Sequence, residues 1–104
     1  MLKIVALVEK REGMGWHDFI EYWDEEHVTV ISDVPNLKRY TIAPAVKPED
    51  APYDGVAELY FESTEDIREG FTEELDRRIR EDEERFLDSV DTFVAAEQTQ
   101  IDET

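Results

Sequence analysis

Two short segments with apolar side chains on both faces constrain the fold of this chain most. Residues 2–8 (LKIVALV) and 56–61 (VAELYF) are rich in aliphatic and β-branched residues and lack a helical stripe, which predicts two strands. The first segment is apolar on both sides of the strand, with Ile4, Ala6 and Val8 on one side and Val5 and Leu7 on the other. A single helix layer covers only one face of a sheet, so the other face needs a partner.

The remaining elements follow from residue spacing and from helix-breaking residues. Apolar residues recur three and four positions apart from Trp16 to Ile31, which predicts one helix after the glycines at 13 and 15. Residues 37–43 (LKRYTIA) alternate as a second strand, and residues 47–54 form a polar loop.

The second half of the chain predicts more helix and a final strand. A helix start is expected at Ser63 or Thr64, where a side-chain oxygen can cap free amides and acidic residues follow. Apolar spacing predicts two helical pieces between residues 64 and 87, without locating the break between them. Residues 92–96 (TFVAA) are expected to form the last strand.

The order of these elements, β-α-β-β-α-β, defines an α+β fold. It matches the ferredoxin-like split βαβ arrangement, in which both helices cover one face of a four-stranded antiparallel sheet. A chain of 104 residues fits one domain, which we place at residues 1–97, followed by a polar C-terminal tail at 98–104. Because one sheet face stays uncovered, we expect a two-fold homodimer, a dimeric α+β barrel in which two sheets pack together.

The charge of the chain limits its partners. Asp and Glu number 28 against 11 Lys and Arg, a formal net charge of −17, which repels phosphate backbones and anionic membrane surfaces. We therefore expect no nucleic-acid and no membrane partner. The acids are interleaved with aromatic and aliphatic residues, which favours a folded body with an acidic coat over a disordered tail. Such a coat suggests a halophilic protein from a salt-accumulating cell.

Cysteine usage and the N-terminal pattern add two expectations. The chain has no cysteine, which excludes disulfide scaffolds and thiolate chemistry. The first apolar stretch, from Ile4 to Val8, is too short for a signal peptide or a membrane span, so we expect a cytoplasmic protein.

Four segments stand out in order along the chain: GMGWHDFIEYWDEEH at 13–27, LKRY at 37–40, YDGVAELYF at 53–61 and EDEERFLD at 81–88. Together they resemble the EthD family of dimeric α+β barrels. The resemblance implies a dimer with a small-molecule pocket, and some relatives are cofactor-free isomerases, decarboxylases or oxygenases. It does not imply one reaction. Val28 and Thr29 depart from the family pattern, which usually follows its histidine with a small residue and proline.

His27 and Tyr40 are the first candidates for catalysis. His27 follows Trp23 by four residues on the apolar helix face, where an imidazole can transfer protons near neutral pH. The alternative is a structural histidine bonded to a carboxylate or carbonyl. The resemblance implies a catalytic histidine at this place and a tyrosine near it, which is Tyr40, although Tyr40 can also be a core aromatic. By strand alternation, Arg39 points to the opposite face from Tyr40.

Glu58 and three aromatic residues complete the candidate site. Glu58 stands in an apolar strand, where a carboxylate must find a partner or accept a raised pKa. A raised pKa would suit a general base, whereas a bonded partner would suit a group that fixes the register of a dimer interface. Trp23 and Tyr60 are candidates for the wall of a flat ligand site, with simple core packing as the alternative. The acid run 81–84 is expected to be a solvated face that Phe86 and Leu87 anchor, and the resemblance places this segment near the pocket mouth.

We expect neither a metal nor a cofactor. Asp24 and His27 have a spacing that two ligands on one helix face can use, but such pairs arise by chance in so acidic a chain. No glycine-rich loop joins a strand to a helix to hold phosphates. The function expected is binding of a small apolar, aromatic or lactone-like molecule, with isomerisation, decarboxylation or oxygenation as the reaction. A non-catalytic binding or accessory module of a degradation pathway is the alternative.

Overall fold

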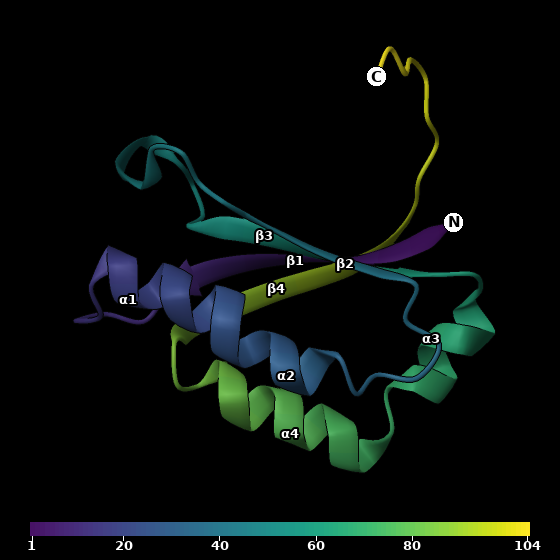
Figure 1. Cartoon of the computed structure of the whole chain (residues 1–104), viewed down its shortest axis with the longest axis horizontal. Helices are drawn as coiled ribbons and strands as arrows, with labels where there is room; N and C mark the ends of the chain where they lie inside the picture. The colour runs from purple at the N-terminus through teal and green to yellow at the C-terminus, as the bar shows by residue number, and fades with distance from the viewer.

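A four-stranded antiparallel sheet carries a layer of helices on one of its faces (Figure 1). The computed structural model describes all 104 residues. The strands are β1 (Leu2–Lys10), β2 (Arg39–Pro44), β3 (Gly55–Phe61) and β4 (Leu87–Ala96), in the spatial order β2-β3-β1-β4. The helices are α1 (Trp16–Glu21), a π-helical turn (Tyr22–Glu26), α2 (His27–Ile31), a short 3-10 turn (Pro48–Asp50), α3 (Thr64–Gly70) and α4 (Glu73–Glu83). This is the predicted α+β, ferredoxin-like arrangement.

The register of the sheet fixes which side chains share a face. Ile4 pairs with Leu59, and Leu59 pairs with Tyr40, so these three residues point to the same side. Glu58 is the neighbour of Leu59 and therefore points to the other side. We call the side of Ile4, Leu59 and Tyr40 the helix-side face, and the side of Glu58 the open face.

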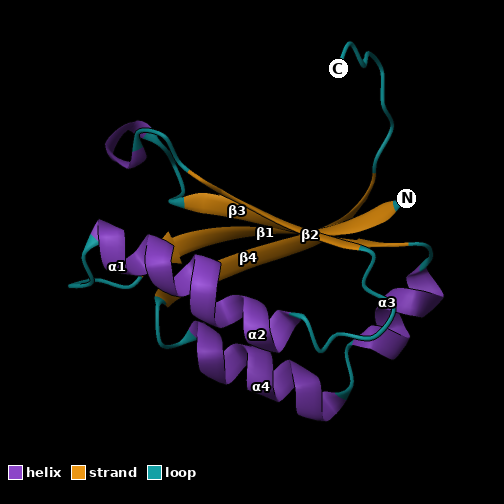
Figure 2. Cartoon of the chain, in the orientation of Figure 1, coloured by secondary structure: helices purple, strands orange, loops and turns teal.

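The helices α1, α2, α3 and α4 all lie on one side of the sheet, as Figure 2 shows. The core between the two layers contains four large side chains with less than 2% exposure, Phe19, Trp23, Phe61 and Phe86. Aliphatic residues of the strands and helices surround them. Burial of these aromatic rings accounts for much of the stability of so small a domain.

The open face carries no helix. Val5, Leu7 and Val56 are half-buried there, and Phe93 is 54% exposed. The loop between β2 and β3 and the C-terminal segment both project on this side of the sheet (Figure 1). None of the helices is both long and apolar enough to cross a membrane.

Side-chain caps begin both helices of the second half. The Ser63 hydroxyl accepts a hydrogen bond from the Asp66 amide at 3.1 Å, which confirms the predicted helix start. The Thr72 hydroxyl accepts from the Leu75 amide at 3.3 Å and starts α4. The break that the sequence pattern did not locate therefore lies at residues 71–72, between the end of α3 and the cap of α4.

Two predicted boundaries were wrong. The helical prediction extended to Leu87, whereas α4 ends at Glu83 and Leu87 is the first residue of β4. The last strand is accordingly ten residues long and begins at 87 instead of 92. The first half of this edge strand reads as polar because Asp91 lies on the open face and Asp88 falls at an irregularity in the pairing with β1, where it is exposed.

Candidate functional site

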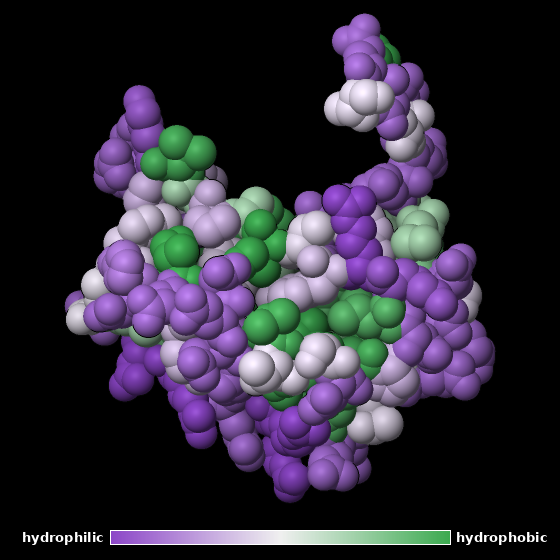
Figure 3. Space-filling view, in the orientation of Figure 1, coloured by the Kyte–Doolittle hydropathy of each residue, from purple (hydrophilic) through white to green (hydrophobic).

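A cavity of about 560 Å³ opens between the helix layer and the helix-side face of the sheet. Most of its wall is apolar, and the hydropathy surface shows hydrophobic residues gathered where the sheet meets the helices, within a largely hydrophilic exterior (Figure 3). The cavity has the size of a small-molecule site. The predicted site residues on its wall are Trp23, His27, Tyr40 and Phe86.

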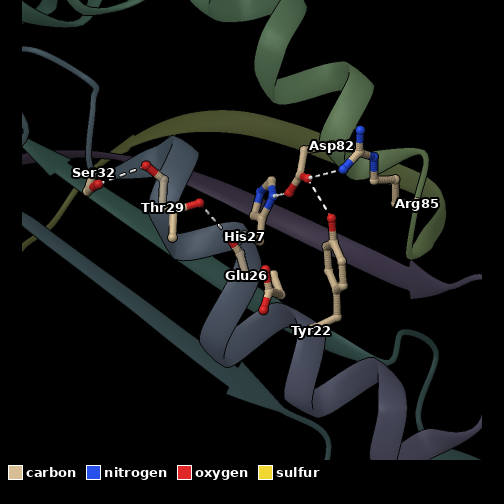
Figure 4. Close-up of polar contacts among 7 residues, drawn as sticks. All are labelled: Tyr22, Glu26, His27, Thr29, Ser32, Asp82 and Arg85. Atoms are coloured by element: carbon tan, nitrogen blue, oxygen red, sulfur yellow. Dashed lines mark hydrogen bonds and ion pairs between the residues drawn. The ribbon is translucent and has the colours of Figure 1, made fainter.

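His27 is the only polar residue of the core. Its side chain is 5% exposed, and its Nδ1 lies 2.6 Å from Oδ2 of Asp82 on α4. The Tyr22 hydroxyl donates to the other oxygen of the same carboxylate, also at 2.6 Å (Figure 4). Asp82 therefore joins α4 to the helical segment 16–31 and orients the imidazole ring.

The π-helical turn allows Tyr22 and His27 to share this carboxylate. In a regular α-helix, residues five apart point about 140° away from each other, since each residue advances by about 100°. Here the His27 amide donates to the Tyr22 carbonyl, a bond between residues five apart that widens the turn. The wider turn places both side chains on the α4 side of the helix, where both reach Asp82 (Figure 4).

The electrostatic environment favours a neutral imidazole. Burial lowers the pKa of His27, and the hydrogen bond and charge of Asp82 oppose that shift only in part. A neutral ring that donates from Nδ1 to Asp82 leaves the lone pair on Nε2. Nε2 makes no hydrogen bond within the chain. Every fully buried side-chain nitrogen and oxygen does have a partner, so Nε2 is not fully buried and can be reached from outside.

Tyr40 faces the cavity from β2. Burial, with a smaller contribution from the charge of Glu83, raises its pKa to about 12, although the Trp23 indole N–H acts in the opposite direction. Tyr40 is thus a hydrogen-bond donor at every working pH. Arg39 points to the open face, as strand alternation predicted, and its guanidinium lies 5.3 Å from the centre of the Tyr60 ring.

Trp23 and Phe86 form the aromatic wall. Trp23 packs against Phe19, with ring centres 5.4 Å apart, and the Phe86 ring lies 4.9 Å from the His27 ring. The Trp23 indole also lies against Gly55, where an added Cβ would come within 2.7 Å of two ring carbons. Glycine at this position lets the indole lie directly on the sheet.

Glu58 and Tyr60 lie on the open face, away from His27. The Glu58 carboxylate is paired with the Lys3 ammonium, which also contacts Glu97 at 3.0 Å. Lys3 lies 5.4 Å from the centre of the Tyr60 ring. The structure therefore brings four of the six predicted site residues together and separates these two from them.

Sequence reasoning missed Asp82 and Glu83. Both were assigned to a solvated acid run, yet Asp82 binds His27 and Glu83 lines the cavity. Burial raises the pKa of Glu83 to about 7, helped by the charges of Asp76 and Asp82 and opposed by Arg80. The signal was present, because Glu83 follows the buried Ile79 by four residues and so lies on the apolar side of α4.

Two further polar residues, His17 and Asp24, lie outside the cavity. His17, the other histidine, is 87% exposed in its side chain and lies 3.8 Å from Glu21. Asp24 is exposed on the π-helical turn, while His27 is bonded to Asp82 instead. No group of three or more potential metal-ligating side chains is present.

Fold and site together define a small ferredoxin-like α+β domain with an apolar cavity built around a carboxylate-bound histidine. The EthD domain model matches residues 11–90, and the chain belongs to this family. Among curated proteins, none matches the chain.

Solved structures share the fold at low sequence identity. An ethyl tert-butyl ether D family protein from Bacillus halodurans is 19% identical, with a TM-score of 0.78, covering 94% of this chain and 99% of its own. A dimeric ferredoxin-like protein of unknown function from Thermobifida fusca is 15% identical, with a TM-score of 0.72, and the match covers 91% of this chain and 89% of that protein. A proposed antibiotic biosynthesis monooxygenase from Nitrosomonas europaea is 13% identical, with a TM-score of 0.65, and the match covers 95% of this chain and 100% of that protein.

Proposed function

We propose that this protein is a homodimeric, cofactor-independent enzyme that binds a small apolar, aromatic or lactone-like molecule in the cavity and begins its reaction by removing a proton with His27. The observation that carries this proposal is a buried histidine oriented by Asp82, whose other ring nitrogen is free beside an apolar cavity. Carboxylate-oriented histidines of this kind serve as general bases.

The roles of the other residues follow from their positions. Tyr40 donates a hydrogen bond to an oxygen of the ligand, and Trp23 and Phe86 hold its flat or apolar part. Isomerisation by proton transfer requires only these groups. Oxygenation without a cofactor would also begin with loss of a proton from the substrate, so both reactions share the first step.

The homodimer is proposed from the open face. Val5, Leu7, Val56 and Phe93 would be covered by the same face of a second copy, and the neighbour from Thermobifida fusca is described as dimeric. Glu58 and Tyr60 then belong to this interface, where Glu58 would fix how the two copies pack and would not act as a base. We further propose that residues 1–97 are the functional unit and that the protein works in the cytoplasm of a salt-accumulating cell, in keeping with its charge of −17.

The first test is a thermal-shift screen in molar KCl with phenols, quinones, lactones and short ethers. A true ligand should raise the melting temperature of the wild type and of His17→Gln, which changes the exposed histidine of the same helical segment. The His27→Gln variant should not convert this ligand, and the Tyr40→Phe variant should convert it more slowly than the wild type. Turnover that is unchanged in His27→Gln would refute the role of His27.

A non-catalytic binding or accessory module is the second candidate, since the cavity alone supports binding. It predicts a ligand whose stabilising effect survives in His27→Gln and which no variant converts. Product analysis by NMR after prolonged incubation separates the two candidates.

A further inference from the structure

The cavity wall combines an apolar surface with an excess of negative groups. Its acidic residues are Asp76, Glu83, Glu84 and Asp88, and its only permanently cationic residue is Arg80. The Arg80 guanidinium is paired with Asp76, its Nε lying 2.9 Å from Oδ2. Burial lowers the pKa of His27, so Arg80 is the one cation on a wall that carries four acidic residues.

Glu83 occupies a special place among these acids. Glu84 and Asp88 are exposed, whereas Glu83 is half-buried and close enough to Tyr40 for its charge to affect that hydroxyl. His27, whose side chain is more than nine-tenths buried, also lines the cavity, and its Nδ1 bonds Asp82, the residue just before Glu83. A ligand that reaches His27 therefore has Glu83 on the wall around it.

We propose that Glu83 is a ligand-contacting residue that makes the cavity selective for uncharged carbonyl compounds over carboxylates. The proposal rests on the proposed function, in that it takes this cavity as the ligand site. A carboxylate ligand would meet four acidic residues and a single cation, Arg80, which is already paired with Asp76, so its charge would be poorly compensated in a partly dry site. An uncharged ketone or lactone instead accepts hydrogen bonds from Tyr40 and from the protonated Glu83.

The protonation state of Glu83 makes this selectivity depend on pH. The groups that face it are Asp76, Arg80 and Asp82 on its own helix and Tyr40 on β2, with His27, Glu84 and Asp88 also on the cavity wall. Its pKa of about 7 means that Glu83 donates a hydrogen bond below neutral pH and repels anions above it. Discrimination against carboxylates should therefore grow as the pH rises from 6 to 8.

The test uses three probes with one ring system, 2-acetonaphthone, 2-naphthoate and 2-naphthylmethylamine. Affinities are measured by Trp fluorescence in molar KCl at pH 6 and pH 8, for the wild type, Glu83→Gln and Glu81→Gln. The last variant makes the same change on the same helix, outside the cavity wall. The ketone should bind more tightly than the carboxylate, and its advantage should rise about tenfold between the two pH values, as one added charge a few ångströms away predicts.

Glu83→Gln should abolish the rise with pH, and Glu81→Gln should keep it. A rise that persists in Glu83→Gln would assign the effect to another group, such as His27, and overturn the proposal, as would carboxylate binding at least as tight as ketone binding at pH 8. Failure of all three probes to bind the wild type would reject the ligand site itself and with it the proposed function. Binding of the ketone with no effect of Glu83→Gln would reject only the role of Glu83.

Discussion

Replacing Asp82 with Asn tests whether the shared carboxylate holds the site together. Asp82 accepts from the Tyr22 hydroxyl and pairs with Nδ1 of His27, both at 2.6 Å, and its side chain is 17% exposed. Hydrogen bonds to a charged group contribute about 1.5–3 kcal/mol each. An amide keeps one acceptor oxygen and so can keep one of the two bonds. We therefore expect the free energy of unfolding to fall by about 2 kcal/mol.

The assay is thermal unfolding at fixed protein concentration, since the melting temperature of the proposed dimer would depend on concentration. A loss of about 2 kcal/mol lowers the melting temperature of a domain of this size by about 8 °C. Asp24→Asn is the matched control, because this aspartate is exposed on the π-helical turn and makes no side-chain hydrogen bond or ion pair. NMR titration should also show a lower pKa for His27 in Asp82→Asn, since Asp82 raises it. Equal melting temperatures for the two variants would refute the reasoning.

Three further predictions concern packing, pH and salt. Gly55→Ala should destabilise the fold by about 1–3 kcal/mol and shift Trp23 fluorescence, because the new Cβ would lie 2.7 Å from the indole, whereas Gly15→Ala has ordinary space and should change little. Folding raises the pKa of Glu83 from 4.5 to about 7, so the folded state disfavours the charged carboxylate. The resulting loss in the free energy of unfolding is absent below pH 4.5, grows as the pH rises and is complete above pH 7. Glu83→Gln should thus raise the melting temperature at pH 8 but not at pH 4, and equal effects at both would contradict this assignment. Replacing molar KCl with dilute buffer should lower the melting temperature, because −17 charges then repel one another unscreened; an unchanged value would exclude the halophile hypothesis.

The sequence predicted the fold class because hydrophobic periodicity and strand-breaking residues agree along most of the chain. The strand at 56–61 and the helix start at Ser63 are local signals and were confirmed. The start of β4 was missed, since Leu87 continues the apolar spacing of α4 and only pairing with β1 identifies it as strand. Pairing between distant segments is a tertiary property that a local pattern does not contain.

The candidate site was predictable where one face of one element decides the outcome. Trp23 and His27 share a helix face, and they do line one cavity. Glu58 was less predictable, because its strand is apolar on both sides and nothing local shows which side the helices cover. The register with β2 decides it: Glu58 pairs with Thr41 and therefore lies opposite to Tyr40.

The π-helical turn is the feature that periodicity could least predict, and it has the largest consequence for the site. A regular helix over 16–31 would place Trp23 and His27 together, but it would turn Tyr22 away from His27. With the turn widened, the same helix presents Trp23 to the sheet and both Tyr22 and His27 to Asp82. Wide turns of this kind are unstable by themselves and persist where tertiary contacts hold them, often at functional sites. Here the contacts are the two bonds to Asp82, so the acid run on α4, which looks like a solvated surface in the sequence, stabilises the conformation that orients the histidine.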